Sequence, residues 1–391
     1  MGRMRWALAG LVGLIMVSAG CAGQDWEEVN VAAQQAHREG RLDEARQLFE
    51  RALEIAEGGD PARWVRSLNN KAEFLRSTGD LRGAIALYRR AVELEESESL
   101  LSRADLARSY GNFARQCEAA AMFDDAYAFS EKALQVREEI LEPGDADLAE
   151  SLNNLGMLAH LRGDDERAAE LLDRAVKIMQ GTLMAGHPGF ATAYTNLAQV
   201  RMATGEPDEA ERLFREAIRI WDMNGGVRTI RAAAGRRNLA GLLATQDRFD
   251  EAESLYFEAL AGLSETVESW HPEMGDLYNN LGLLYRRQQR FGEAETYYLR
   301  AVAIFENGTD RGALAGTLFN IGRLYKDQSR DDEAARLLER SLGEYESILG
   351  GDHVNLLAVL DQYAEVLERT GRADEAARLK QRSQTIRNAG S

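Results

Sequence analysis

Apolar and small side chains recur along this chain with the spacing of amphipathic helices. Counting from one alanine, such residues fall at that alanine and three, four and seven positions later, as in Ala210, Leu213, Phe214 and Ala217. This spacing places them on one face of an α-helix. A second stripe lies sixteen, thirteen, twelve and nine positions before the alanine, as within residues 318–325. The pattern therefore predicts two helices that pack face to face.

The same two-helix pattern returns at nearly constant intervals. The steps between the recurring alanines are 39, 42, 42, 42, 42, 42, 40 and 42 residues. The nine alanines are Ala45, Ala84, Ala126, Ala168, Ala210, Ala252, Ala294, Ala334 and Ala376. A period of this length is typical of stacked repeats, none of which can bury its apolar face alone. We predict one all-α solenoid over residues 25–387, with about nine helix hairpins and a short tail, 388–391.

Glycines mark the turns and the close contacts within the repeats. Gly79 and Gly163 lie five positions before the alanine, where a first helix would end in a left-handed cap. Gly205 and Gly371 share that position. Twelve positions before the alanine the first helix carries glycine or alanine, as at Gly282, which permits close approach of the second helix. A bulky residue there should overpack the pair.

The first twenty residues have the organisation of an export signal. Arg3 and Arg5 precede an apolar segment, 6–17, and small residues lead up to Cys21. This looks like a bacterial lipoprotein leader, although Ser18 stands where leucine is usual. The resemblance implies removal of residues 1–20 and acylation of Cys21, for example with palmitate. An uncleaved anchor, or a secretory peptide cut elsewhere, is the alternative.

A lipid-anchored chain would lie in the bacterial cell envelope on the periplasmic side. Residues 21–24 would form the acylated N-terminus and a short tether, which keeps the solenoid close to the membrane. Ala22 and Gly23, with no aspartate, stand directly after Cys21, and this favours the outer membrane. Cys117 would be the one remaining thiol, and its place in the helix pattern predicts a small core residue.

The net charge argues against one class of partner. It is −17, and two units more negative without Arg3 and Arg5. A chain this acidic repels a phosphate backbone at long range, so we do not expect nucleic-acid binding.

No catalytic or cofactor-binding constellation is visible in the sequence. His187, His271 and His353 recur in equivalent turns of different repeats, so they cannot converge on one metal ion. No serine has an accompanying base at a recognisable spacing, and the glycines do not form a phosphate-binding loop. We predict a protein that is not an enzyme, with no cofactor, no metal and no small-molecule substrate.

The repeats resemble a known family. Residues 152–156 and 280–285 and the turns at 186–188 and 270–272 are similar to tetratricopeptide repeats, in the 42-residue variety of kinesin light chains. The resemblance covers nearly all of the chain after the leader. It implies a right-handed α-α superhelix that serves as a peptide- or protein-binding scaffold.

A column of asparagines is the strongest candidate for a binding site. Fourteen positions before the alanine, seven consecutive repeats carry Asn70, Asn112, Asn154, Asn196, Asn238, Asn280 and Asn320. This position points about 150–200° away from the core stripe. Asparagine costs a helix about half a kcal/mol relative to alanine. The resemblance implies that the column lines the concave groove and holds a peptide backbone. The alternative is that the asparagines persisted from an ancestral repeat or bond locally within the stack.

The neighbours of the column would set the character of the groove. Met157, Leu161 and Gln199 predict a small, partly apolar floor in the middle repeats. The later repeats bring a group of basic residues, Arg286, Arg287, Arg323 and Lys326. They predict a cationic segment beside the apolar centre, unless they only form a solvated charged face.

Three functions are compatible with these features. The first is a membrane-tethered scaffold that binds a peptide segment or protein partner in its concave groove, during assembly or regulation of a cell-envelope complex. The second is an adaptor that binds through its convex face or its ends. The third is a peptide-sensing receptor similar to cytosolic quorum-sensing receptors, against which the leader and the lack of an effector domain count.

Overall fold

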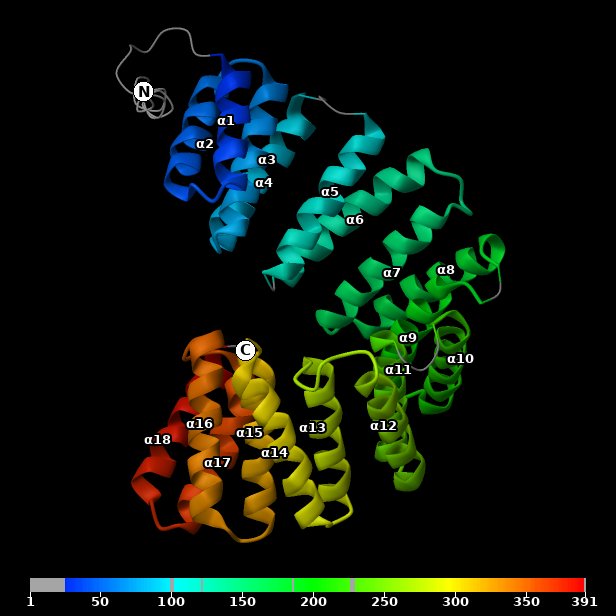
Figure 1. The fold of residues 1–391 in the computed structure, drawn as a ribbon, viewed down its shortest axis with the longest axis vertical. Helices are drawn as coiled ribbons and strands as arrows, with labels where there is room; N and C mark the ends of the chain where they lie inside the picture. Colours follow the sequence, from blue (N-terminus) through cyan, green and yellow to red (C-terminus); the bar gives the residue numbers. More distant parts are fainter. Residues whose placement is uncertain (1–24, 99–101, 121, 185, 226–228, 390–391) are drawn as a thin grey trace, which may run out of the picture. The chain divides into compact units, whose positions relative to one another are not determined.

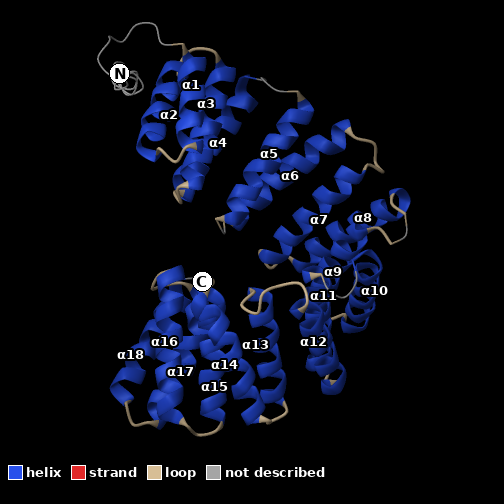
Figure 2. Ribbon diagram, viewed as in Figure 1, coloured by secondary structure: helices blue, strands red, loops and turns tan. Residues whose placement is uncertain are grey.

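The computed structural model describes residues 25–98, 102–120, 122–184, 186–225 and 229–389, and these residues form helices joined by turns and loops, without strands (Figures 1 and 2). The leader and Cys21 lie outside the described residues. The helices are α1 (Trp26–Arg38), α2 (Leu42–Ala56), α3 (Pro61–Ser77), α4 (Leu81–Glu98), α5 (Arg103–Ala119), α6 (Phe123–Ile140), α7 (Ala146–Leu161), α8 (Asp165–Thr182), α9 (Pro188–Ala203), α10 (Pro207–Gly225), α11 (Ile230–Thr245), α12 (Phe249–Ser264), α13 (Pro272–Arg287), α14 (Phe291–Asn307), α15 (Arg311–Asp327), α16 (Asp331–Leu349), α17 (Leu357–Arg369) and α18 (Ala373–Ala389), with a short 3-10 helix η1 (Val354–Leu356) before α17. The eighteen α-helices within these described ranges correspond to nine two-helix repeats, as the alanine period predicts.

The contacts divide the chain into two bodies, one ending at Gly163 and one beginning at Asp164. The first body holds α1 to α7. Within it α1 packs on α2, α3 on α4 and α5 on α6, and the second body holds the corresponding pairs from α9 with α10 to α17 with α18. Each first helix also contacts the second helix of the repeat before it, as α14 contacts α15. The predicted hairpins are therefore present in both bodies.

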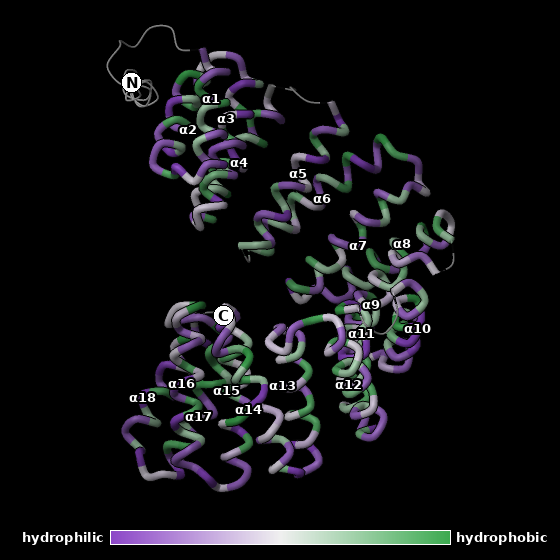
Figure 3. The backbone as a smooth tube through the Cα atoms, in the orientation of Figure 1, coloured by the Kyte–Doolittle hydropathy of each residue, from purple (hydrophilic) through white to green (hydrophobic). Residues whose placement is uncertain are grey.

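The recurring alanines form the centre of each hairpin. All nine are buried, none of them more than 2% exposed. Four positions further on, large side chains such as Phe49, Phe214 and Tyr298 are equally buried, and each contributes about 1.5–3 kcal/mol through removal of apolar surface from water. Figure 3 shows the result as an alternation of hydrophobic and hydrophilic segments along the helices.

Glycine at the small-residue position allows a first helix to approach an aromatic ring. A Cβ atom built on Gly282 of α13 would lie 2.5 Å from Cδ1 and 2.6 Å from Cε1 of Tyr298 on α14. A Cβ on Gly322 of α15 would lie 2.7 Å from Cγ of Leu338. Real Cβ contacts are not this short, so the glycines are required by the helix spacing.

The turn between the two helices of a repeat has a left-handed residue five positions before the alanine. Gly163 has φ 80° and Gly79 has φ 90° there, as predicted. Three repeats use other residues at this position: Asp247, Gln289 and Ser329, with φ between 59° and 60°. The C-cap geometry is therefore kept even where the favoured glycine is absent, at some cost in backbone strain.

The recurring histidines cap the helices that follow them. Nδ1 of His187 accepts a hydrogen bond from the backbone N–H of Gly189 at 3.1 Å, and Nδ1 of His271 accepts from Glu273 at 3.2 Å. His353 makes the same contact with Asn355 at 3.1 Å. Each satisfies one of the unpaired donors at a helix N-terminus, which gives a structural reason for their recurrence in the turns.

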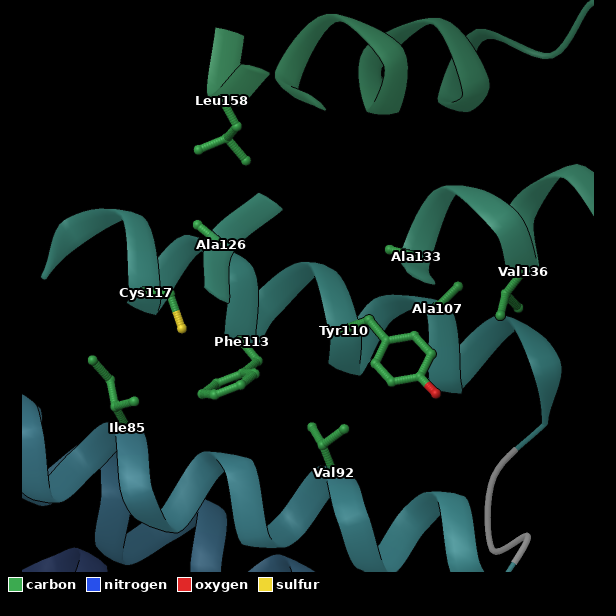
Figure 4. Close-up of a cluster of buried hydrophobic side chains, with 10 residues drawn as sticks. All are labelled: Ile85, Val92, Ala107, Tyr110, Phe113, Cys117, Ala126, Ala133, Val136 and Leu158. Carbon is green, nitrogen blue, oxygen red and sulfur yellow. The ribbon is translucent and has the colours of Figure 1, made fainter. Parts of the chain in front are cut away.

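Cys117 is a core residue, as predicted. It is fully buried on α5 in a cluster that includes Ile85, Phe113 and Ala126 (Figure 4). Burial, with a smaller contribution from Asp125, raises the pKa of its thiol to about 11. The thiol is thus a packing group at neutral pH.

Candidate binding face

The seven asparagines lie on the first helices of their repeats and outside the cores. In the first body Asn70 is half-buried, and Asn112 and Asn154 are exposed. In the second body the remaining four, on α9, α11, α13 and α15, are half-buried. We call this surface of the first helices the asparagine face. Two of the seven side chains are exposed and five are half-buried, and their binding role stays a prediction.

Some of the asparagines bond to a neighbouring repeat. Nδ2 of Asn70 donates to Oδ1 of Asn30 at 2.8 Å, and Nδ2 of Asn320 donates to Oδ1 of Asn279 at 3.0 Å. In both cases the acceptor lies fifteen positions before the alanine of the preceding repeat. Local bonding within the stack therefore explains part of the column, and the sequence reasoning missed these partners.

The local bonds do not use up the hydrogen-bonding capacity of the column. An asparagine amide has two donors and an acceptor with two lone pairs, and Asn70 and Asn320 each donate one hydrogen. Within the described ranges, Asn238 and Asn280 have no hydrogen-bonded partner. Amide groups thus remain available on the asparagine face of both bodies.

The apolar and amide neighbours of the column are accessible. On α7, Met157 is half-buried and Leu161 is 50% exposed. On α9, Gln199 is half-buried. In the first body Met157 and Leu161 follow Asn154 on α7, and in the second body Gln199 follows Asn196 on α9; their role in binding stays a prediction.

The predicted cationic segment is largely neutralised, which changes our expectation for the later repeats. Arg286 lies 2.7 Å from a carboxylate oxygen of Asp327, Arg287 3.0 Å from Asp247 and Lys326 2.8 Å from Glu365. Their partners lie on adjacent repeats or in the turns, about forty residues away in the sequence. These charges hold neighbouring repeats together and are not available as a group to an acidic ligand.

Arg323 differs from the other three cations. In the part of the chain that the structure describes it has no ion pair, and its guanidinium lies 5.6 Å from the ring centroid of Phe319. Burial and the neighbouring Arg286 lower its pKa. Arg323 is therefore the member of the predicted group without an ion-pair partner among the described residues.

A hollow of about 370 Å³ lies on the asparagine face of the first body, between α3, α4 and α5. Asn70 and Asn112 line it, together with Asn69, Glu73, Tyr88, Val92, Glu95, Ser109, Phe113, Arg115 and Gln116. We call it the Glu95 hollow. It brings two members of the predicted column to one concave site, together with a carboxylate that the sequence analysis did not single out.

Glu95 is the unusual residue of this hollow. Its side chain is only 4% exposed, and its Oε2 atom has no hydrogen-bond partner in the structure. Burial raises the pKa of Glu95, against a smaller lowering effect of the Ser109 hydroxyl. A buried carboxylate without a cation is costly, so this residue lowers the stability of the repeat that contains it.

The stability of the first body should therefore increase when Glu95 is replaced by methionine. At pH 7 we expect a gain of about 1–3 kcal/mol, the usual cost of an uncompensated buried polar group. The folded state holds the proton more tightly than the unfolded chain, whose glutamate titrates near 4.5. Wild-type stability is thus lost as pH rises from 4.5 through the raised pKa, and the gain from methionine should vanish below 4.5. Urea unfolding followed by circular dichroism at several pH values measures this gain in stability.

The matched control is Glu131→Met, at an exposed position of α6. It should leave the urea midpoint within about 0.5 kcal/mol of wild type at every pH. A Glu95→Met protein less stable than wild type at pH 7 would contradict the assignment of Glu95 as an uncompensated carboxylate.

The described residues lack a grouped metal site and a membrane-spanning helix. Across the described ranges, no three His, Cys, Asp or Glu side chains are grouped as a metal site requires. In the same residues, no helix combines the length and the apolar character needed to cross a bilayer.

Comparison with known proteins gives one family. The sequence model described as Tetratricopeptide repeat matches residues 28–97, 105–181, 189–265 and 273–347. These segments make up more than half of the chain. No protein of curated function matches it.

Several solved structures have a similar fold. The apo form of the quorum sensor NprR from B. thuringiensis is 13% identical, with 92% of this chain and 98% of that chain covered and a TM-score of 0.60. A Rap protein complexed with Competence and Sporulation Factor is 14% identical, with 93% and 98% covered and a TM-score of 0.57. The kinesin light chain TPR-like repeats of Podosopora anserina are 22% identical, with 54% and 100% covered and a TM-score of 0.47.

These likenesses bear on the fold alone. The TM-score of the kinesin light chain repeats is too low to decide the variety of repeat, which stays a prediction from the 42-residue period. The family itself rests on the sequence match over most of the helical region and on the paired helices of both bodies. The chain belongs to the tetratricopeptide repeat family.

Proposed function

We propose that this protein is a scaffold whose asparagine face binds an extended segment of a partner protein. The observation that carries the proposal is the column of seven asparagines on seven successive first helices, outside the cores and with amide groups still available. Each asparagine weakens its helix by about half a kcal/mol relative to alanine. The two local bonds between repeats account for only part of this cost.

An amide column suits recognition of a peptide main chain. Each peptide unit of an extended ligand presents one N–H donor and one C=O acceptor, and an asparagine side chain can meet either. The accessible Met157 and Leu161 would contact apolar side chains of the segment. The negative net charge of the chain would favour a basic partner at long range.

Replacing Asn154, Asn196, Asn238 and Asn280 together by alanine should strongly reduce capture of the partner while keeping the fold. Alanine is the better helix former, so a loss of binding would not reflect unfolding. The measurement is pull-down from membrane extracts with the purified variant, checked by circular dichroism. We expect at least a tenfold loss of captured partner.

The control removes four amides from second helices, by alanine substitution of Gln135, Gln180, Asn307 and Gln381, all exposed. This variant should capture the partner as wild type does. Retained capture by the folded asparagine variant would exclude the asparagine face as the binding site.

We further propose that the scaffold is tethered to the bacterial envelope through acylated Cys21. There it would act in assembly or regulation of an envelope complex. The support is the order of the first residues, with two arginines, an apolar segment and small residues before the cysteine. Stable anchoring needs more than one acyl chain, which such a leader provides.

Metabolic labelling with a fatty-acid analogue tests the tether. Wild type should incorporate the label into the membrane fraction, and Cys21→Ser should not. Cys117→Ser is the matched control, because it removes the other thiol and should leave labelling unchanged. An unlabelled wild type, or a labelled Cys21→Ser protein, would refute the tether without affecting the binding proposal.

One observation favours a second candidate, an adaptor that binds through its second helices. In the second body, a hollow of about 450 Å³ between α14, α15 and α16 is lined by Val302, Leu318 and Leu337 and by Leu299, which is 50% exposed. A partner with an apolar side chain could dock there. Loss of capture by Leu299→Asp, with capture retained by the asparagine variant, would favour this function.

A peptide sensor remains the third candidate. The structurally similar Rap protein was solved in complex with Competence and Sporulation Factor, which is compatible with ligand binding by this fold. A peptide that dissociated a preformed partner complex would favour the sensor over the scaffold.

A further inference from the structure

The Glu95 hollow has an acidic side chain at a position of the repeat that is apolar in most repeats. Glu95 lies eleven positions after the recurring alanine. Five other repeats hold a buried apolar side chain there, namely Ala56, Met179, Trp221, Leu263 and Phe305, and the remaining three hold Arg137, Tyr345 and Arg387. Glu95 is the one carboxylate at this position, and it is buried where these five repeats have an apolar packing residue.

Among the residues that the structure describes, none forms an ion pair with Glu95, and its Oε2 atom has no hydrogen-bond partner. Arg115 lines the hollow, and its guanidinium donates to Oδ1 of Asn112. Two arginines of α4 make other contacts: Arg89 lies 2.8 Å from Asp125, and Arg90 lies over the ring of Trp64. The Glu95 carboxylate is therefore left without a cationic partner in the described part of the chain.

Beside the Arg115 guanidinium and the amides of Asn69 and Gln116, the hollow offers further acceptors. Because Nδ2 of Asn70 donates to Asn30, its Oδ1 atom is left as an acceptor. The carboxylate of Glu73, which accepts from Tyr88 at 3.1 Å and is paired with Arg76, lines the same hollow. Val92 and Phe113 supply apolar walls. A buried carboxylate, further acceptors and apolar walls together suit a long side chain with a cationic end.

We propose that the Glu95 hollow receives a basic side chain, with a guanidinium or ammonium end, from the segment bound along the asparagine face. The inference rests on the proposed function, because the hollow shares Asn70 and Asn112 with the binding face. The cation would donate to Oε2 of Glu95 and to Oδ1 of Asn70, and its methylene groups would pack on Val92 and Phe113. The ligand thus supplies the charge that the chain lacks.

The test selects peptides on the immobilised full chain from a random displayed heptapeptide library. Peptides selected on the wild-type chain should share one position that is rich in arginine or lysine. Peptides selected on the Glu95→Gln variant should lack this shared position. A selected peptide is then synthesised with arginine, lysine or uncharged citrulline at that position. Citrulline should weaken binding to wild type at least tenfold and should not weaken binding to Glu95→Gln. The arginine and lysine peptides distinguish guanidinium from ammonium.

Glu131→Gln is the control for loss of an exposed carboxylate, and it should retain the wild-type preference. Peptides that bind without a basic position, and lose binding in the asparagine variant, would overturn this inference and leave the proposed function intact. A basic preference that persists in Glu95→Gln would also overturn it. A library that yields no peptide dependent on the asparagines would count against both.

Discussion

Replacement of Gly282 by leucine is expected to lower the stability of the second body by about 2–3 kcal/mol, the usual cost of overpacking a core. A Cβ atom at this position already falls 2.5 Å from the ring of Tyr298, and that ring is fully buried. The ring cannot turn away without displacing the core between α13 and α14. The helices must therefore separate, and the alanine contacts of that hairpin are weakened.

The same substitution at Gly343 is the matched control. Gly343 lies in the interior of α16, and a Cβ there meets no atom within 4 Å. Gly343→Leu should raise stability by up to about 1 kcal/mol through helix propensity. Urea midpoints of the two variants measure the difference. Equal midpoints would show that the glycine at the small-residue position has no packing role.

Replacement of Asp222 by alanine is the second change with a large expected effect. Arg236 on α11 is only 3% exposed, and its Nη2 atom lies 2.7 Å from Oδ2 of Asp222 on α10. Its remaining contacts, to Glu258 and to the carbonyl of Ala232, are both 3.4 Å long. Loss of Asp222 leaves a buried guanidinium without its main partner.

Such a loss costs about 3–5 kcal/mol when both partners are buried. Since the Asp222 side chain is 34% exposed, solvent screening reduces the expected loss to about 2–3 kcal/mol. Arg236→Met alone leaves a carboxylate whose Oδ1 atom is already buried without a partner and should lower stability by about 1–2 kcal/mol, while the double variant removes both charges and should change it by less than about 1 kcal/mol. Thermal unfolding of the two variants and of the double variant measures the coupling. A harmless Asp222→Ala would contradict the role of this ion pair.

The fold could be predicted from the sequence because its determinants are local and repeated. The alanine period places the hairpins, and Gly163 and Gly79 mark the turns, since few other residues adopt positive φ without strain. The same rule could not locate the turns at Asp247, Gln289 and Ser329, where the helices on both sides impose the left-handed conformation. The 42-residue period also predicts that the seven asparagines occupy the same position on successive first helices.

The candidate site was less predictable because it depends on contacts between repeats. The bond between Asn70 and Asn30 joins residues forty positions apart, and only the stacking of first helices brings them together. The pairs Arg286 with Asp327 and Lys326 with Glu365 arise in the same way, so the basic group looked unpaired in the sequence. The sequence does contain a signal that could have identified Glu95. Most repeats have an apolar residue at the equivalent position, so a glutamate there stands out.

Site-specific photocrosslinking in intact cells shows directly whether the asparagine face contacts the partner. A photoreactive phenylalanine analogue is placed at Gln199, beside Asn196 on the asparagine face, or at Gln180, exposed on the second helix α8. The account predicts a crosslinked product of higher mass from position 199 and none from position 180. Crosslinking from position 180 alone would show that the partner binds the second helices and would contradict the account.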